Sequence, residues 1–318
     1  MILLRSGGEA PRHTIGVFGA GLVGSALVES LCSLSGMRTA RLPLDWTDSA
    51  ERDRQLEQIR ARIAEACGPA EGARLTLVWS AGRAGFASGR GQTAAELENF
   101  RAVLALSRRC AEELPNAVTR LVHFSSAGGL FEGQRLVDSR SVPRPRRPYG
   151  ELKEEQERLL LATRIPAVIV RLSSVYGPAG AGQRTGLVST LLLNGIRRRV
   201  SSIYGSMDTL RDFVWTGDVA AFVSRLILGE PGTNGAQTIL LASGRPFSIF
   251  EIQKIIEDLL GYKIYVSHAP GAPNREDITF SRAALPPGWV PSDLRANAGI
   301  VYREAMRTGF GSGGADLR

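Results

Sequence analysis

The first strongly patterned segment of the chain is an apolar run that leads through glycines into helical spacing. Residues 15–34 (IGVFGAGLVGSALVESLCSL) therefore predict a buried strand, a tight turn and an amphipathic helix. Similar strand and helix patterns alternate over the first half of the chain. Such alternation predicts an α/β fold, a Rossmann-type doubly wound parallel sheet with helices on both faces. The further segments are strand 39–46, helix 49–66, strand 75–82, helix 95–114, strand 120–129, helix 149–163 and strand 166–178.

The second half of the chain is less regular and predicts a second, smaller lobe. It contains Gly/Pro-rich loops and short elements, although residues 237–243 (QTILLAS) have the pattern of a strand that returns to the main sheet. We predict an NAD(P)-binding Rossmann domain over residues 1–177, to which residues 211–243 return. Residues 178–210 and 244–318 then form a discontinuous C-terminal substrate-binding lobe.

Composition narrows the class of ligand. The 318 residues are 43% hydrophobic and 22% charged, which is typical of a globular protein. The net charge of +8 comes almost wholly from Arg, since Lys occurs only at positions 153, 254 and 263. The basic-aromatic pattern of nucleic-acid surfaces is missing, so we expect no nucleic-acid partner. Guanidinium groups bind diphosphates in a bidentate manner, so an anionic small ligand suits this charge better.

Cysteine usage and the first residues bear on location. Cys32, Cys67 and Cys110 are odd in number and lack metal-type spacing, which indicates reduced thiols in the cytoplasm and no metal site. The opening MILLRSGGEAPRH is too short and too polar for a signal peptide. No apolar run has the length of a membrane span, so we expect no membrane partner.

The glycine turn has the spacing of a dinucleotide-binding loop. Gly19, Gly21 and Gly24 form G-A-G-L22-V23-G between a strand and a helix. The first glycine permits the tight turn, the second allows a pyrophosphate to approach the backbone, and the third allows the helix to pack on the strand. The amides at the helix N-terminus, including those of Leu22 and Val23, then face the anion.

The choice between NAD and NADP depends on the residues after the second strand. Asp45 lies about twenty residues beyond the glycines, where it would accept hydrogen bonds from an adenosine ribose and favour NAD. Alternatively, Asp45 is a solvated residue that opens the next helix. Only one strand fits between the first helix and residue 75, where such folds usually have two, and Arg38 or Arg41 would suit a 2′-phosphate. NADP therefore stays open.

Tyr149 and Lys153 are the candidate acid/base pair. They lie four residues apart at the start of a helix, so both point to one face. Free Tyr has a pKa near 10, and a nearby ammonium favours the phenolate, which brings deprotonation toward working pH. Tyr149 would then take a proton from a hydroxyl group. Alternatively, Tyr149 is a surface side chain packed on the stem of Lys153.

Several motifs occur together with this pair in a recognisable order. A strand ends in Ser125-Ser126 upstream of Tyr-x-x-x-Lys, and two further motifs follow it, R171-L-S-S-V-Y-G-P178 and R211-D-F-V-W-T-G-D218-V219. In these features the chain, over about residues 14–305, resembles the extended short-chain dehydrogenase/reductase family, the NAD-dependent nucleotide-sugar epimerase/dehydratase group.

The resemblance implies further roles. It places Asn99 in a structural or cofactor-side position, the Ala81-Gly82 turn along the dinucleotide, and Lys153 on the nicotinamide ribose. It implies that Arg211 and Arg275 hold the diphosphate of a nucleotide sugar, and that Ser125 and Ser126 contact the substrate. It also implies a homodimer built on helices 93–113 and 149–163.

The chain departs from the family pattern after the serine pair. The position where the catalytic hydroxyl usually stands is Ala127. Either Ser126 replaces it through a one-residue shift, with Ser125 as a structural residue, or Tyr149 works without a full hydroxyl partner. We favour Ser126. The Asp-Glu pair that 4,6-dehydratases use is replaced by Ala127 and Gly128, which cannot transfer protons, so dehydration is disfavoured. His123 is expected to be a satisfied core residue.

The leading hypothesis is therefore a nucleotide-sugar epimerase that acts at C4. Tyr149 would take the 4-hydroxyl proton, NAD would accept hydride and later return it to the other face of the sugar, and Ser126 would hydrogen-bond the reacting oxygen. The nearest alternative is a nucleotide-linked keto-sugar reductase that uses the same residues. The alternative from another class is a non-catalytic dinucleotide-binding regulator.

Overall fold

The computed structural model describes residues 1–6, 13–69, 71–180, 184–229, 235–269 and 276–311. Within these ranges no helix combines the length and the apolar character needed to cross a membrane. The chain divides into two compact units, each described here by itself. The first unit comprises Met1–Leu130, Pro143–Leu172 and Ala220–Leu240, and the second comprises Phe131–Val142, Ser173–Val219 and Leu241–Arg318.

The first unit is built on a seven-stranded sheet in the order β10-β6-β5-β4-β2-β1-β3. Strands β2, β4, β5 and β6 pair in parallel. These strands are nearly continuous apolar runs because helices cover both faces of the sheet. The strands are β1 (Ile2–Arg5), β2 (His13–Phe18), β3 (Arg38–Arg41), β4 (Ala73–Trp79), β5 (Ala117–Ser126), β6 (Ala167–Leu172) and β10 (Ala236–Leu241).

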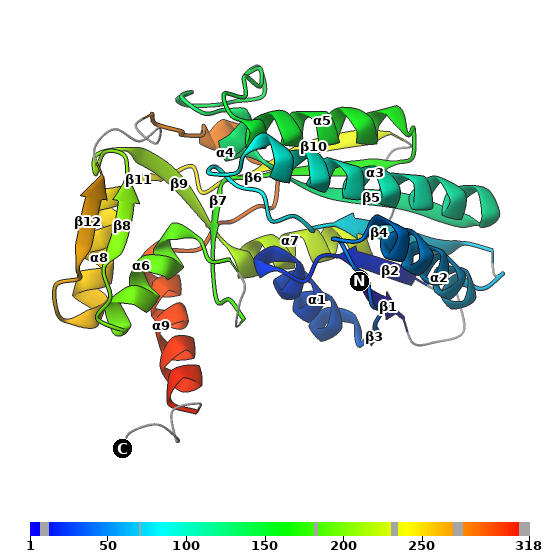
Figure 1. The fold of residues 1–318 in the computed structure, drawn as a ribbon, viewed down its shortest axis with the longest axis horizontal. Helices are drawn as coiled ribbons and strands as arrows, with labels where there is room; N and C mark the ends of the chain where they lie inside the picture. Colours follow the sequence, from blue (N-terminus) through cyan, green and yellow to red (C-terminus); the bar gives the residue numbers. More distant parts are fainter. Residues whose placement is uncertain (7–12, 70, 181–183, 230–234, 270–275, 312–318) are drawn as a thin grey trace. The chain divides into compact units, whose positions relative to one another are not determined.

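Helices cover the two faces of this sheet (Figure 1). Three of them pack on one face, where their apolar stripes meet Leu75, Leu77 and Leu121 in one core cluster. Helix α1 and most of α7 lie on the opposite face (Figure 1). The helices are α1 (Leu22–Ser35), α2 (Ser49–Cys67), α3 (Arg90–Glu113), the short α4 (Ala127–Leu130), α5 (Pro148–Ala162) and α7 (Thr216–Leu228), of which α2, α3 and α5 form the first group.

The strand β1 is an unexpected part of this sheet. It runs antiparallel between β2 and β3, with Ile2 opposite Val17 on one side and Arg41 on the other. In the usual doubly wound order the strand after the first helix lies directly beside the glycine-loop strand. Here β1 takes that place. Strands are about 4.8 Å apart, so β3 stands about two strand spacings from β2.

The second unit contains two small sheets and a helical layer. One sheet has the order β11-β9-β7 and the other pairs β12 with β8 in parallel. Buried aliphatic side chains of α6, α8 and α9 form a core with Phe213 and Phe247 of the β11-β9-β7 sheet. The elements are β7 (Ser174–Tyr176), α6 (Leu187–Ile196), β8 (Ser201–Tyr204), β9 (Leu210–Trp215), β11 (Pro246–Ser248), α8 (Ile249–Leu260), β12 (Val266–Ala269), the 3₁₀ turn η1 (Arg282–Ala284) and α9 (Leu294–Gly311).

The predicted fold class is confirmed, since the strand and helix segments read from the sequence form a mostly parallel Rossmann-type sheet. The parallel expectation fails at β1, a strand that the sequence analysis did not identify. The second unit includes residues 131–142, 173–177, 211–219 and 241–243, which the sequence ranges above place with the Rossmann domain.

We predict that the inserted strand β1 contributes measurably to the stability of the fold. Leu4 of β1 is fully buried. Leu4→Ala should lower the free energy of unfolding by about 2–5 kcal/mol, because it removes buried methyl groups and leaves a cavity. Chemical denaturation would measure this. The matched control is Leu34→Ala, whose side chain is 56% exposed and should cost about 0.5 kcal/mol or less. Equal effects of the two substitutions would mean that β1 is not an integral strand.

Candidate active site

The glycine turn between β2 and α1 is held by close backbone approaches. Gly19 has φ of +97°, and a Cβ on it would lie 2.4 Å from the backbone of Ala81. A Cβ on Gly24 would lie 2.0 Å from the carbonyl oxygen of Gly19. Neither position therefore accepts a side chain. The turn brings the start of α1 against the end of β4, as the sequence predicts for the first and third glycines.

The middle glycine meets a different requirement. A Cβ on Gly21 would meet nothing within 4 Å. Gly21 is the N-cap of α1 and offers no side-chain cap, and the first turn of the helix has no acidic residue. The amides that begin with Leu22 and Val23 therefore keep their positive potential for an external anion. Open space above an uncapped helix start fits a dinucleotide pyrophosphate.

The turn after β4 closes the other side of this loop. Ser80 donates its hydroxyl to the carbonyl oxygen of Gly19 at 2.6 Å and its amide to that of Phe18 at 2.9 Å. Gly82 has φ of +143°, and a Cβ there would lie 2.5 Å from the carboxylate of Glu96. Ala81 thus lies against the glycine loop and Gly82 against Glu96, and contact of this turn with the cofactor stays a prediction.

Tyr149 lies at the start of α5 beside the end of β5. Its ring packs on Gly129, where a Cβ would come within 3.1 Å of the ring. Ser126 ends β5, and its hydroxyl accepts the amide hydrogen of Gly129 at 3.1 Å. Tyr149 and Ser126 are half-buried, whereas Ala127 is fully buried. Of the two adjacent positions, only Ser126 carries a hydroxyl, and Gly129, which donates to it, lies against the Tyr149 ring.

Lys153 lies one turn further along α5 in a buried polar network. Its ammonium donates to Glu96 Oε1 at 3.1 Å and to Gln156 Oε1 at 2.9 Å, and it lies 5.7 Å from the centre of the Tyr149 ring. The other oxygen of Glu96 accepts the amide of Ala84 at 3.0 Å. Burial opposes the charged form of Lys153, but Glu96 and Tyr149 outweigh it, so the pKa of Lys153 is raised. The cation behind Tyr149 therefore persists.

Ser125 takes part in a second buried polar network. Its hydroxyl donates to Glu157 Oε1 at 2.6 Å, and Arg171 binds both oxygens of that carboxylate, at 3.0 and 2.7 Å. Ser125 and Ser126 alternate on β5, so their side chains point to opposite faces of the sheet. Ser125 thus belongs to a buried structural network, which suits the structural role expected for it and gives no support to the substrate contact implied by resemblance.

An aromatic contact that the sequence did not indicate borders Tyr149. The ring of Phe86 lies 5.8 Å from that of Tyr149, centre to centre. The guanidinium of Arg147 lies 5.0 Å from the centre of the Phe86 ring and donates to the Phe86 carbonyl oxygen at 3.4 Å. Arg147 is the N-cap residue of α5. Phe86 and Arg147 therefore fix the loop after β4 to the start of the helix that carries Tyr149.

Asp45 is placed differently from the sequence expectation. It follows β3, which β1 separates from the glycine-loop strand. Its carboxylate accepts the amide and the hydroxyl of Thr47, each at 2.7 Å, and these bonds lower the pKa of Asp45. The cap of α2 is Asp48 rather than Asp45. Asp45 is thus engaged in its own turn, and its contact with a ribose stays a prediction.

Asn99 lies on α3 but does not join the Lys153 network. Its side-chain amide donates to the carbonyl oxygen of Trp46 at 3.1 Å, and its oxygen accepts from Arg52 at 2.9 Å. Asn99 therefore connects α3 to the β3–α2 segment. This placement supports the structural half of the role that the resemblance implies.

Arg211 and Arg275, the arginines predicted to bind the diphosphate, fall within the residue ranges of the second unit. The Arg211 guanidinium donates to the carbonyl oxygens of Leu210, at 3.1 Å, and of Glu276. Arg275 lies outside the described residues. The neighbouring motif residue Asp212 accepts two amides and a hydroxyl from Ser243 and Gly244. This motif thus holds β9 to the segment after β10, and a diphosphate role for both arginines stays a prediction.

His123 is a core residue, but it is not satisfied as expected. It is 1% exposed, and neither ring nitrogen has a hydrogen-bond partner among the described residues. Burial, and then the charge of Lys153, hold the pKa of His123 well below its usual range. His123 is therefore a neutral ring, stacked 5.2 Å from Phe100, at the buried side of the Lys153 network.

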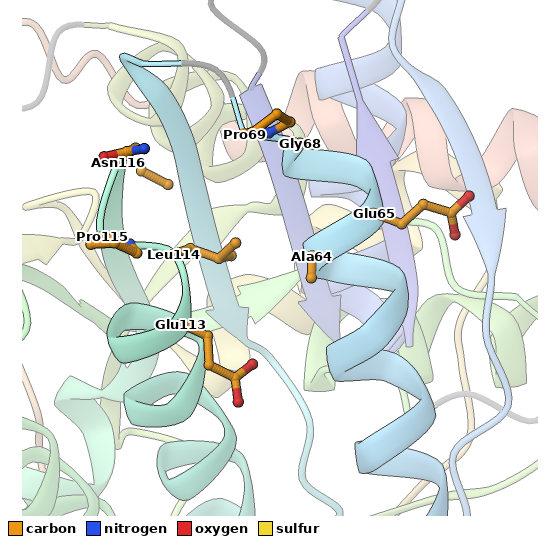
Figure 2. Close-up of a pocket in the computed structure, with 9 residues that line it drawn as sticks. Ala64, Glu65, Gly68, Pro69, Glu113, Leu114, Pro115 and Asn116 are labelled. Atoms are coloured by element: carbon orange, nitrogen blue, oxygen red, sulfur yellow. The ribbon is translucent and has the colours of Figure 1, made fainter.

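A pocket of about 500 Å³ lies elsewhere in the first unit (Figure 2). It lies at the C-terminal ends of α2 and α3 and beside Ala117, the first residue of β5. Ser126 ends the same strand at the opposite edge of the sheet. The pocket is thus not part of the Tyr149 site. Its lining residues are Ala64, Glu65, Gly68, Pro69, Glu113, Leu114, Pro115, Asn116 and Ala117.

Comparison with known proteins identifies the family of the chain. The family model described as "NAD dependent epimerase/dehydratase family" matches residues 15–236. A dTDP-L-rhamnose 4-epimerase of Burkholderia thailandensis is 33% identical over 135 residues, which are 40% of this chain and 37% of that protein. A dTDP-glucose 4,6-dehydratase of Escherichia coli is 25% identical over 172 residues, 47% of this chain and 45% of that protein. The chain thus matches less than half of each of these relatives.

The fold has solved counterparts over nearly its whole length. UDP-glucose 4-epimerase from Thermotoga maritima, solved with UDP-glucose, has a TM-score of 0.71. The superposition covers 93% of this chain and 99% of that one, at 18% sequence identity. At this identity the likeness shows the fold.

Two glycine substitutions separate cofactor binding from folding. Gly21→Ala should leave stability nearly unchanged, because its Cβ meets no protein atom, yet weaken NAD binding by about tenfold or more, since 1.4 kcal/mol of lost contact is tenfold. Gly24→Ala should lower the melting temperature, because its Cβ would clash with the Gly19 carbonyl. Isothermal titration with NAD and thermal unfolding would measure both. Unchanged NAD affinity in Gly21→Ala would place the cofactor elsewhere.

The two serines should respond oppositely to alanine substitution. Ser125→Ala should cost about 1–3 kcal/mol of stability, because it leaves a buried carboxylate short of a donor, with little effect on turnover. Ser126→Ala should retain stability and lower kcat by tenfold or more. Denaturation and steady-state kinetics on both variants would decide, and a larger kcat loss in Ser125→Ala would contradict this assignment.

Proposed function

This chain belongs to the NAD-dependent epimerase/dehydratase family, and we propose that it is a nucleotide-sugar epimerase that acts at C4 of the sugar. The observation that carries the proposal is the arrangement around Tyr149. The half-buried phenol packs on Gly129, whose amide donates to the Ser126 hydroxyl, and the buried, charged Lys153 lies 5.7 Å from the centre of its ring. This arrangement suits proton removal from a sugar hydroxyl.

The residues of the chain divide the work as follows. The phenolate oxygen of Tyr149 takes the proton of the 4-hydroxyl and later returns it to the 4-oxygen of the epimer. Lys153 favours the phenolate through its positive charge and offers its ammonium to a ribose. Ser126 donates a hydrogen bond to the reacting oxygen. NAD, when bound at the glycine turn, supplies a reversible hydride acceptor.

Dehydration is less well supported, although a 4,6-dehydratase is among the relatives. Ala127 and Gly128 follow Ser126, and neither can move a proton from carbon or to a leaving hydroxyl. Ala127 is also fully buried. The hydroxyl groups of Tyr149 and Ser126 thus both act on the 4-oxygen of the sugar. Action on this one oxygen is sufficient for epimerisation or for ketone reduction.

A keto-sugar reductase is the second candidate, favoured by one observation. Asp45 is occupied in its own turn and β1 separates its strand from β2, whereas Arg38 and Arg41 are exposed on β3. Such surroundings suit NADP, which would exchange at each turnover. Mass spectrometry of the molecules released by denaturing the purified protein distinguishes the two, since a C4 epimerase retains stoichiometric NAD.

A nucleotide-diphosphate sugar as substrate, a homodimer and a cytoplasmic location complete the proposal. Cys32, Cys67 and Cys110 are free thiols, as suits a reducing compartment. The outer side of α3 and α5 carries the chain of ion pairs Glu98–Arg101–Glu155–Arg158. A dimer built on these two helices would therefore be matched by charge rather than by apolar burial.

Substitution of Tyr149 tests whether the protein acts as the proposed enzyme. Tyr149→Phe should lower kcat for interconversion of UDP-glucose and UDP-galactose, or of dTDP-linked hexoses, by about 10²–10⁴-fold, because it removes the proton acceptor. Proton NMR of the anomeric signals follows the reaction. Tyr204→Phe, at a residue that is 58% exposed, is the matched control and should keep full activity. Full biological activity of Tyr149→Phe would favour the non-catalytic regulator.

A further inference from the structure

Glu96 makes more contacts with the proposed catalytic elements than its place in the sequence suggests. One carboxylate oxygen binds the Lys153 ammonium at 3.1 Å, and the other binds the Ala84 amide at 3.0 Å. The side chains of Glu96 and Lys153 are only 6% and 7% exposed. Glu96 thus joins the turn after β4 to the helix that carries Tyr149.

We propose that Glu96 is a positioning residue that keeps Lys153 charged and directed toward Tyr149, and that it thereby sets the alkaline limit of the reaction. The catalytic consequence rests on the proposed function. The hold of Glu96 on Lys153 does not, and it is measured separately below.

Stability alone does not account for this pair. Removing two charges from water costs several kcal/mol each, and apolar side chains of similar volume are often at least as stabilising as a buried ion pair. The buried positions nearest to Glu96 on α3 are Thr93 and Phe100, and those nearest to Lys153 on α5 include Leu152 and Gln156. A buried charge pair at this place is therefore better explained by a need for the charge than by a contribution to stability.

The groups around Lys153 leave Glu96 as the carboxylate in contact with it. From its own helix, Lys153 meets Tyr149, Gln156 and the more distant Glu157. Glu157 is bound on both oxygens by Arg171 and also accepts the Ser125 hydroxyl. From β5, among the residues that the structure describes, His123 is the titratable group that interacts with Lys153, and its low pKa keeps it neutral.

The sign of the effect follows from these neighbours. Without Glu96, Lys153 would be a desolvated ammonium that contacts Gln156 and the Tyr149 ring and binds no carboxylate of the described residues. Burial then favours the neutral amine. An opposite charge at this distance typically shifts a pKa by about one to three units. Glu96→Gln keeps the shape of the side chain and removes this contribution.

The composition of the chain permits a direct measurement. Lys occurs only at positions 153, 254 and 263, and Lys254 and Lys263 are 58% and 82% exposed. Protein labelled with ¹³C-lysine therefore gives three Cε signals. The Lys254→Arg and Lys263→Arg variants identify those two, and the remaining signal is Lys153. Its titration needs neither substrate nor turnover.

The expected result is that Glu96→Gln lowers the midpoint of Lys153 titration by about one pH unit or more. The matched control is Glu98→Gln, the same change two residues along α3, where the side chain is 62% exposed and pairs with Arg101. It should leave the midpoint unchanged. A Glu96→Gln midpoint equal to that of the wild type would overturn the proposal. Should Glu96→Gln not fold, Glu96→Asp has to lower the midpoint, and an unchanged midpoint there overturns it equally.

The pH dependence of kcat/KM then tests whether the contact between Glu96 and Lys153 affects the reaction. The alkaline limb of kcat/KM should move to lower pH in Glu96→Gln by the same amount as the Lys153 midpoint, and it should not move in Glu98→Gln. A limb that stays in place while the midpoint falls would overturn the catalytic part. Loss of the proposed function is recognised independently, because Tyr149→Phe would then retain activity.

Discussion

Charges buried between the central sheet and helices α3 and α5 have to be paired, and this requirement organises the edge where Tyr149 lies. Glu96 pairs with Lys153, and Glu157 pairs with Arg171. Breaking such a pair typically costs about 3–5 kcal/mol, because the remaining charge stays buried without a partner. The ends of β5 and β6 and the first turns of α5 are thus fixed by groups that tolerate little displacement. A reacting phenol benefits from such a rigid support.

Most of the fold could be predicted because its signals are local. Strand and helix periodicities lie within single segments of the sequence, and the glycine turn carries its own backbone requirement at Gly19. The strand β1 could not be predicted in this way. It has only four residues, lacks clear alternation and exists because two strands far along the chain hydrogen-bond to it. The same non-local pairing removed β3, and with it Asp45, from the place beside β2.

The residues of the candidate site also differ in whether local sequence could predict them. Tyr149 and Lys153 could be found because both lie on one helical turn. Glu96 could not, because the sequence A-E-L-E-N shows Glu96 and Glu98 as equivalent charged positions on an amphipathic helix. One is buried against a residue 57 positions away, while the other faces solvent. The opposite orientations of Ser125 and Ser126, by contrast, followed from strand alternation, a signal available in the sequence.

A paired cation behind the phenol suits a reaction that has to run in both directions. The acid/base group of an epimerase takes a proton from one hydroxyl and returns it to the epimer in the same cycle. An unopposed buried ammonium would favour the phenolate strongly and hinder the return of the proton. A carboxylate 3.1 Å from the ammonium moderates this field while it prevents loss of the charge. The efficiency of acid/base catalysis is greatest when neither protonation state is strongly favoured, so the Glu96–Lys153 pair matches the demand of a reversible proton transfer better than either charge alone.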